Sequence, residues 1–138
     1  MRLTQFTDYA LRLLLQLASD HPGGKTTVGE ASRLLGIPLN HLTKIALRLA
    51  KAGMVTAIRG RNGGLVLSRP ASQITIGQVL RITEPDFALV GCMAGQDCSL
   101  FLNCKMIPLL GDALAAFLRV ADQATIEEML QRPVRTQA

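Results

Sequence analysis

Hydrophobic positions recur along most of this chain at spacings of three and four, the pattern of amphipathic helices. The first apolar stripe predicts a helix over residues 7–19, with Thr7 as its N-cap residue and Asp8 in its first turn. A Pro-Gly-Gly turn at residues 22–24 ends this helix. The stripe consists of Leu11, Leu14, Leu15 and Ala18.

Two further helices are separated by a tight glycine turn. Thr27 and Glu30 form a capping box for a helix over residues 28–35, and Gly36 supplies the left-handed residue that ends it. The next stripe predicts a helix that begins at residue 39 or 40 and continues to residue 52. Two short helices joined in this way are typical of a helix-turn-helix.

A β-hairpin is predicted directly after these helices. Residues 54–59 and 64–69 favour strands, and Gly60-Arg61-Asn62-Gly63 lies between them; Asn-Gly between apolar runs is the strongest short-range hairpin signal. This hairpin would form a wing beside the third helix. The predicted fold is therefore mainly α with a small β-hairpin wing, a winged helix-turn-helix.

The charge distribution divides the chain in two. Residues 1–70 carry ten lysines and arginines against three acids, a net charge of +7, whereas residues 71–138 carry five against seven, a net charge of −2. A basic first half favours a polyanionic partner, double-stranded DNA, although scattered solvated charges would give the same count. The residues expected to contact DNA are Asn40, His41, Thr43, Lys44 and Arg48 of the third helix and Arg59, Arg61 and Asn62 of the wing.

Residues 84–104 follow a short helix over residues 76–82, capped by Thr75, and have no clear periodicity. They hold all three cysteines of the chain, Cys92, Cys98 and Cys104. Soft thiolates in this number select an iron-sulfur cluster or zinc, and structural zinc sites favour closer pairs and a fourth ligand. Three cysteines without a metal are the plainer alternative.

A long apolar helix is predicted from residue 105. Its stripe predicts a dimerisation helix, whereas packing on its own lobe is the alternative; a dimer would match the two-fold symmetry of an operator. Thr125 and Glu128 predict a capping box for a last helix that ends before Pro133. The stripe consists of Ile107, Leu110, Leu114, Phe117 and Ala121.

The expected organisation is a DNA-binding lobe over residues 1–83, a cluster-binding loop over 84–104, dimerisation and terminal helices over 105–132, and a flexible tail over 133–138. No apolar stretch approaches the roughly 18 residues of a membrane span, and charges interrupt any signal-peptide core at the N-terminus. We therefore expect a cytoplasmic protein that has no membrane partner. The odd number of cysteines fits such a reducing compartment.

Three segments carry a resemblance to a known family. They are MRLT with FTDYALR at residues 1–12, RGRNGG at residues 59–64, and the three-cysteine loop before a long helix. Over roughly residues 1–132 the chain resembles the winged-helix iron-sulfur repressors that include NsrR and IscR. The resemblance implies a homodimer that binds a two-fold operator when its cluster, 4Fe-4S rather than 2Fe-2S, is in the required state.

The fourth cluster ligand separates the branches of that family. The IscR-like branch has a histidine three residues after the last cysteine, and here that position is Ile107. In the NsrR-like branch, which the chain resembles more closely, an aspartate of the first helix reaches the other subunit's cluster; Asp8 stands in the matching motif. Asp97 is a rival oxygen donor, and an ion pair with Arg12 is the simpler interpretation of Asp8.

The function predicted from these features is a cluster-dependent transcriptional repressor that senses nitric oxide. A sensor of iron or cluster status in the same family is the alternative, and a small iron-sulfur electron carrier is the alternative of another class. The basic helix-turn-helix argues against an electron carrier. An enzyme is not expected, because no histidine, acid or phosphate-cradling motif accompanies the cysteines.

Overall fold

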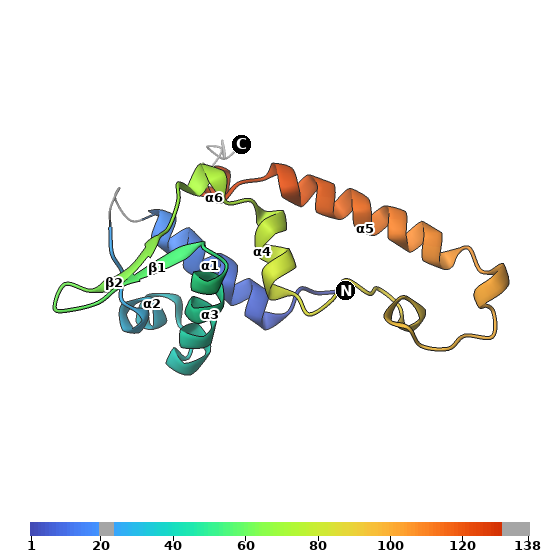
Figure 1. Ribbon diagram of the computed structural model, residues 1–138, viewed down its shortest axis with the longest axis horizontal. Helices are drawn as coiled ribbons and strands as arrows, with labels where there is room; N and C mark the ends of the chain where they lie inside the picture. The colour runs from blue at the N-terminus through green and yellow to red at the C-terminus, as the bar shows by residue number, and fades with distance from the viewer. Residues whose placement is uncertain (20–23, 131–138) are drawn as a thin grey trace, which may run out of the picture.

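The computed structural model describes residues 1–19 and 24–130, and its N-terminal half forms a winged helix-turn-helix. Helices α1 (Gln5–Ser19), α2 (Val28–Leu35) and α3 (Leu39–Lys51) are followed by the antiparallel hairpin of β1 (Val55–Ile58) and β2 (Gly64–Leu67). Figure 1 shows the hairpin projecting to one side of the three helices. The predicted fold class is confirmed.

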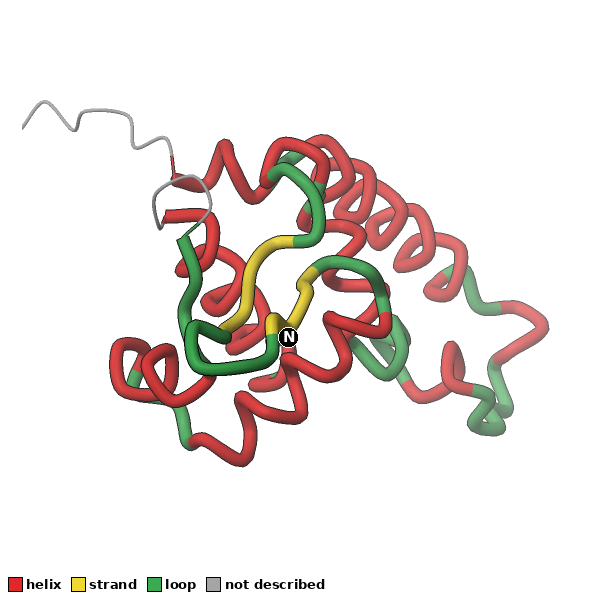
Figure 2. Tube along the Cα trace, turned by 60° about the vertical axis from the view of Figure 1, so that its left-hand side comes forward, coloured by secondary structure: helices red, strands yellow, loops and turns green. Residues whose placement is uncertain are grey.

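The second half forms an arm. Short turn η1 (Ala71–Gln73) and helix α4 (Ile76–Thr83) complete the N-terminal lobe, which we define as residues 1–83. A loop containing the turns η2 (Gly91–Ala94) and η3 (Phe101–Asn103) then runs to the far end of α5 (Met106–Gln123), and α6 (Ile126–Leu130) follows beside the lobe. Figures 1 and 2 both show α5 extending away from the lobe, so the arm consists of this loop and α5.

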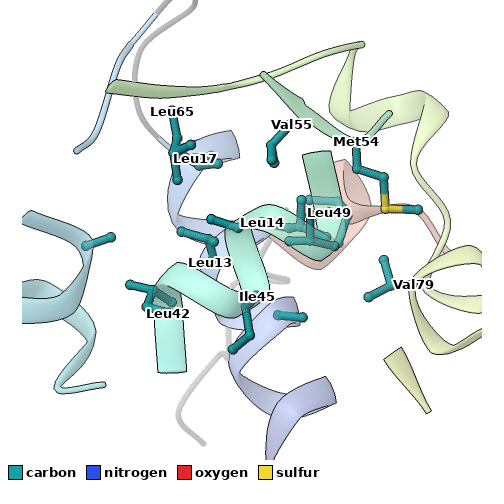
Figure 3. Close-up of a cluster of buried hydrophobic side chains, with 14 of the residues drawn as sticks. Leu13, Leu14, Leu17, Leu42, Ile45, Leu49, Met54, Val55, Leu65 and Val79 are labelled. Carbon is teal, nitrogen blue, oxygen red and sulfur yellow. The ribbon is translucent and has the colours of Figure 1, made fainter. Parts of the chain in front are cut away.

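Helix α1 provides the centre of the hydrophobic core. Its residues Ala10, Leu13 and Leu14 are fully buried, and the helix contacts α2, α3, α4, α6 and β2. Side chains from α3 and the hairpin close over it, as Figure 3 shows. Leu42, Ile45 and Leu49 come from α3, Met54 and Val55 from the start of the hairpin, and Leu65 from β2.

The turn between α2 and α3 follows the predicted chemistry. The Thr27 hydroxyl accepts the Glu30 N–H at 3.1 Å, and the Glu30 carboxylate accepts the Thr27 N–H at 2.9 Å. Gly36 has φ 66°, a left-handed conformation that is unfavourable for a residue with a side chain. The Ser32 hydroxyl donates to the Ile37 carbonyl at 2.6 Å, which fixes the turn that sets the angle between the helices.

The first helix begins earlier than the sequence predicts. It starts at Gln5, and the Thr4 hydroxyl accepts the Thr7 N–H at 3.3 Å. Thr7 is therefore not the N-cap residue: it is buried at 0% exposure, and its hydroxyl contacts Thr83 and Glu84. The prediction failed because a threonine near a helix start favours capping locally, whereas here distant residues of α4 provide its partners.

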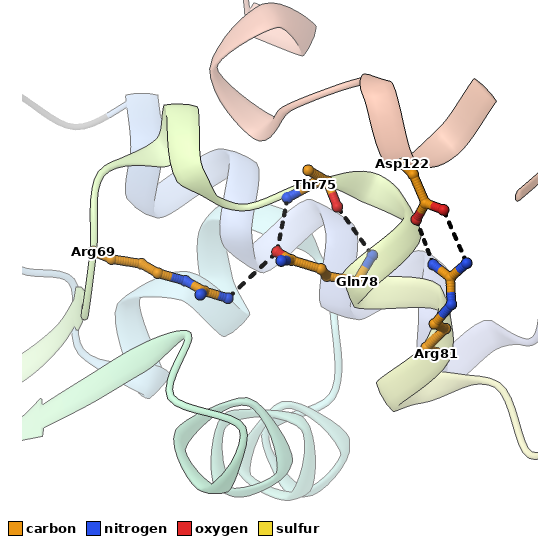
Figure 4. A network of polar contacts seen from close by, with 5 residues as sticks. All are labelled: Arg69, Thr75, Gln78, Arg81 and Asp122. Carbon is orange, nitrogen blue, oxygen red and sulfur yellow. Dashed lines mark hydrogen bonds and ion pairs between the residues drawn. The ribbon is translucent and has the colours of Figure 1, made fainter. Parts of the chain in front are cut away.

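Helix α5 is joined to the lobe at its C-terminal end. Asp122 forms a two-point ion pair with Arg81 of α4, drawn in Figure 4. The Arg81 guanidinium holds the pKa of Asp122 below its ordinary value. A Cβ at Gly77 would lie 1.9 Å from the Asp122 carboxylate, so only glycine allows this approach.

Helix α5 is only partly covered by the described residues. Ala121 is its one buried residue. Leu109, Phe117 and Val120 are 63%, 43% and 66% exposed. The helix thus contacts α4 of the lobe but leaves one apolar face open to solvent. None of the described helices is long and apolar enough to cross a lipid bilayer.

The terminal helix has the predicted capping box, since the Thr125 hydroxyl accepts the Glu128 N–H at 3.2 Å and the Glu128 carboxylate accepts the Thr125 N–H at 2.8 Å. Its described residues end at Leu130. The predicted end before Pro133 and the tail over 133–138 lie outside the described residues. Helix α4 ends at Thr83 and α5 begins at Met106.

Replacing Leu42 with alanine should lower the free energy of unfolding by about 2–5 kcal/mol, because the fully buried side chain would leave a cavity between α1 and α3. Urea denaturation measures this change. Leu47→Ala on the exposed face of the same helix is the matched control and should change stability by less than about 0.5 kcal/mol. Equal effects of the two substitutions would show that Leu42 is not a core residue.

Candidate nucleic-acid interface and cysteine loop

The exposed face of α3 presents the side chains that the sequence predicts for DNA contact. Asn40, Lys44 and Arg48 are spaced four residues apart and therefore lie along one side of the helix, and all three are exposed. His41 and Thr43 flank this line and are also exposed. The Thr43 hydroxyl donates to the Leu39 carbonyl at 2.8 Å, so its oxygen remains available as an acceptor.

The wing presents a second group of exposed polar side chains. Arg59 follows β1, and Arg61 and Asn62 form the turn between the strands. The Lys25 ammonium donates to the Asn62 carbonyl at 2.6 Å. Thr26 also pairs with Leu65 through two backbone hydrogen bonds, which join the segment before α2 to the hairpin. The segment before α2 therefore holds the wing in addition to the pairing of its own strands.

A shallow depression of about 250 Å³ lies between α1 and α3, next to the predicted DNA face. The Gln5 amide donates to the Tyr9 hydroxyl at 2.8 Å, and the Tyr9 ring lies 6.2 Å from the His41 ring, centroid to centroid. Lys44 contributes a positive charge to the same depression. The N-terminal half of α1 is thus placed beside the basic face of α3.

The three cysteines lie on the loop of the arm as free thiols. Cys92 lies in η2 and is half-buried, Cys98 is exposed, and Cys104 is half-buried two residues before α5. The Cys104 sulfur accepts the Met106 N–H at 3.4 Å. Gly95 has φ 86° and permits the sharp turn between the first two cysteines.

The donor set of this loop fits an iron-sulfur cluster in its chemistry. Three thiols occupy the loop between the lobe and α5, none forms a disulfide, and none is fully buried. Among the described residues, however, no group of three cysteine, histidine, aspartate or glutamate side chains is arranged to hold a metal ion. The structure therefore shows separate thiols, and a shared site would require the loop to close around its ligand.

The two candidate oxygen donors lie in different surroundings. Asp8 of α1 forms a two-point ion pair with Arg12, with contacts of 3.1 and 3.2 Å, and the two side chains are 48% and 53% exposed. Asp97 is an exposed residue of the loop beside Cys98. Ile107, at the position of the alternative histidine ligand, is half-buried near the start of α5.

Sequence reasoning missed two long-range polar contacts, one between the lobe and the start of the loop and one within the lobe. Glu84 accepts hydrogen bonds from Thr4 and Thr7, and Lys25 holds the wing. These pairs are separated by 37 to 80 residues, so no local spacing indicates them. The two threonines in the first turn were the available signal, and they point equally well to helix capping.

Comparison with known families gives a match over nearly the whole chain. The Rrf2 family model, described as an iron-dependent transcriptional regulator, matches residues 3–132. The chain belongs to the Rrf2 family. Rrf2 proteins are transcriptional regulators rather than enzymes, and they bind DNA and typically dimerise. This confirms the family resemblance, which does not distinguish the NsrR-like branch from the others.

Solved Rrf2 structures share this fold. CymR, the global cysteine regulator of B. subtilis, is 25% identical with a TM-score of 0.73, covering 94% of this chain and 95% of that one. The oxidized form of Staphylococcus aureus CymR is 20% identical with a TM-score of 0.74, covering 96% and 98%. IscR of T. potens is 21% identical with a TM-score of 0.75, covering 95% and 87%.

Proposed function

We propose that this Rrf2 protein is a homodimeric repressor whose affinity for its operator depends on an iron-sulfur cluster held by Cys92, Cys98 and Cys104. The observation that carries the proposal is the location of these thiols. They are free, they share one loop, and that loop joins the N-terminal lobe to a helix whose apolar side chains are exposed. A ligand bound there can affect both DNA reading and dimerisation.

The DNA surface of the proposal consists of α3 and the wing. The exposed line of Asn40, Lys44 and Arg48 is suited to the major groove, where side chains meet base edges and flanking phosphates. Arg59 and Arg61 would reach the neighbouring backbone or minor groove. Because Lys25 holds the wing turn, those arginines are positioned before DNA arrives, which lowers the entropy lost on binding.

The dimer surface of the proposal is the apolar face of α5. Leu109, Phe117 and Val120 stay exposed in the single chain, and burying such side chains is worth about 25 cal/mol for each Å² of apolar surface. A second copy presents the same face, so a two-fold arrangement buries both helices at once. This arrangement matches an operator with two-fold symmetry.

The loop cysteines would hold the cluster, 4Fe-4S rather than 2Fe-2S, and Asp8 of the second subunit would supply the fourth ligand. The ion pair between Asp8 and Arg12 does not prevent this role, because an exposed pair of this spacing stabilises a helix by only about 0.3–0.5 kcal/mol. Asp97 is the alternative donor from the loop itself. When bound, the cluster would supply iron sites that nitric oxide can attack.

Nitric oxide is the proposed signal, and iron availability is the second candidate, favoured by the family's description as iron-dependent. One experiment separates them. Anaerobically purified protein is examined by visible spectroscopy and by operator binding, before and after nitric oxide and, separately, after iron chelation. Nitric oxide is supported as the signal if it abolishes DNA binding at concentrations that do not change the DNA binding of the iron-chelated control.

Cys98→Ser should abolish most of the iron and sulfide that copurify with the protein, because an open site that loses one of three soft ligands exposes iron to water and oxygen. Iron and sulfide analysis of anaerobic preparations measures the loss. Ser99→Ala, at the neighbouring exposed position, should retain wild-type loading. Unchanged iron and sulfide in the cysteine variant would exclude Cys98 as a ligand.

Arg59→Ala should weaken binding at every DNA sequence and reduce the slope of log affinity against log salt by about one, because one phosphate contact is lost. Fluorescence anisotropy over a range of salt concentrations measures both. Arg119→Ala, an exposed arginine of α5, is the charge-matched control and should leave the slope unchanged. The same slope in all three proteins would place the wing away from DNA.

Asp8→Ala should still bind iron through the three cysteines, but with an altered visible spectrum, a more labile cluster and weaker operator binding. Arg12→Ala is the matched control, since it breaks the same ion pair and keeps the carboxylate. If Asp8 acts only through Arg12, the two variants will behave alike. Wild-type spectra, nitric oxide response and affinity in Asp8→Ala would remove the carboxylate from the site.

A further inference from the structure

Glu84 lies where the N-terminal lobe meets the loop, and three hydrogen bonds converge on one of its carboxylate oxygens. Its Oε1 accepts from the Thr4 N–H at 2.8 Å, from the Thr4 hydroxyl at 2.9 Å and from the Thr7 hydroxyl at 2.5 Å. These contacts join the first turn of α1 to the residue that follows α4. We call Thr4, Thr7, Thr83 and Glu84 the Glu84 cluster.

The hydrogen bonds of the Glu84 cluster form a continuous network that is partly buried. Thr7 and Thr83 are buried, and their hydroxyl oxygens lie 2.8 Å apart. The Thr83 hydroxyl also donates to the Val79 carbonyl at 2.8 Å, within α4. Removing the carboxylate would leave two buried or half-buried hydroxyl groups and one backbone N–H with fewer partners, which is costly in a protein interior.

The carboxylate of Glu84 is held in its charged form. Burial alone would raise the pKa of Glu84, but the hydrogen bonds from Thr7 and Thr4 together place that pKa below its ordinary value. A charged acceptor makes these hydrogen bonds stronger than bonds between neutral groups. The contact between α1 and the end of α4 therefore has a preferred geometry rather than a loose apolar fit.

The Glu84 cluster lies between three parts of the molecule that the proposed function uses. Glu84 is the first residue of the segment that leads to the cysteines. Thr7 is adjacent to Asp8, and the two side chains point in different directions, one buried against α4 and one exposed. Helix α1 also packs directly on α3. A displacement at the start of the loop would therefore reach both Asp8 and the DNA-reading helix.

We propose that Glu84 is a positioning residue that fixes the first turn of α1 against the start of the cysteine loop and so couples the state of the loop to DNA binding. This inference rests on the proposed function, because the change to be transmitted is the binding or loss of an iron-sulfur cluster on the loop. Glu84 itself does not touch DNA or iron in this scheme. It acts through Thr4, Thr7 and the helix that they begin.

The test compares operator affinity in cluster-loaded and metal-free protein, measured for wild type, Glu84→Ala and Glu84→Gln. The ratio of the two affinities is the coupling, which for linked sites is typically about 5- to 150-fold. We expect this ratio to fall to within about twofold of unity in Glu84→Ala. Glu84→Gln should restore part of it, since a glutamine carbonyl can still accept the threonine hydrogen bonds.

Asp86→Ala is the matched control. That carboxylate lies two residues further along the same loop and accepts the Ala88 N–H at 2.8 Å, a contact within the loop. The coupling ratio should stay at its wild-type value in this variant. If Glu84→Ala weakens DNA binding of loaded and metal-free protein by the same factor, the residue is only structural and the inference is overturned.

A second measurement does not require a bound iron-sulfur cluster. All three cysteines of the chain lie on the loop, so thiol alkylation of the metal-free protein modifies that segment alone. Alkylation should change amide hydrogen exchange at residues 5–10 in wild type and in Asp86→Ala, but not in Glu84→Ala. Unaltered amide hydrogen exchange at residues 5–10 of alkylated wild type would overturn the coupling. If wild type shows the change in exchange but purifies without iron, only the proposed function is overturned.

Discussion

The burial of helix α1 is the constraint on which the rest of this structure depends. A chain of 138 residues has enough apolar side chains for one core, and here that core forms around Ala10, Leu13 and Leu14. Helix α3, the wing strand β2, α4 and the terminal helix α6 all contact α1. Because so many elements share one central helix, its position cannot change without affecting the DNA-reading surface.

The arm follows from the same limit. With the core complete inside the lobe, α5 fully buries only Ala121 and keeps Leu109, Phe117 and Val120 exposed. An isolated helix is marginal in water, because most helical stability in proteins comes from tertiary packing. The division into a closed lobe and an open arm therefore leaves an apolar helix face that a second copy of the chain would cover in the proposed dimer.

Local sequence signals were sufficient for most of the fold. The Thr27 and Glu30 capping box, the left-handed Gly36 and the Asn-Gly hairpin each operate within a few residues, and the structure confirms all three. Thr7 shows the limit of such reasoning. Local sequence predicts its hydroxyl as a helix cap, but two of its partners, Thr83 and Glu84, lie 76 and 77 residues away, a separation that no local pattern reveals.

The candidate sites divide in the same way. Exposure of the basic residues on α3 and the wing could be predicted, because helical and strand periodicity determine which side chains face water. The cysteine loop has no such periodicity, so its sequence gave the donor types and not their arrangement. The contacts that join the lobe to the loop through Glu84, and to α5 through Arg81, depend on the tertiary fold and have no local sequence signal.

The close approach of Gly77 to Asp122 has a mechanical consequence. Helix α5 has 18 residues and is therefore about 27 Å long, and it is fixed to the lobe at the end where that approach occurs. Over such a length, a rotation of about 10° at the fixed end moves the opposite end by roughly 5 Å. A change of angle where α4 meets α5 would therefore displace Cys104, near the opposite end of α5, more than Asp122.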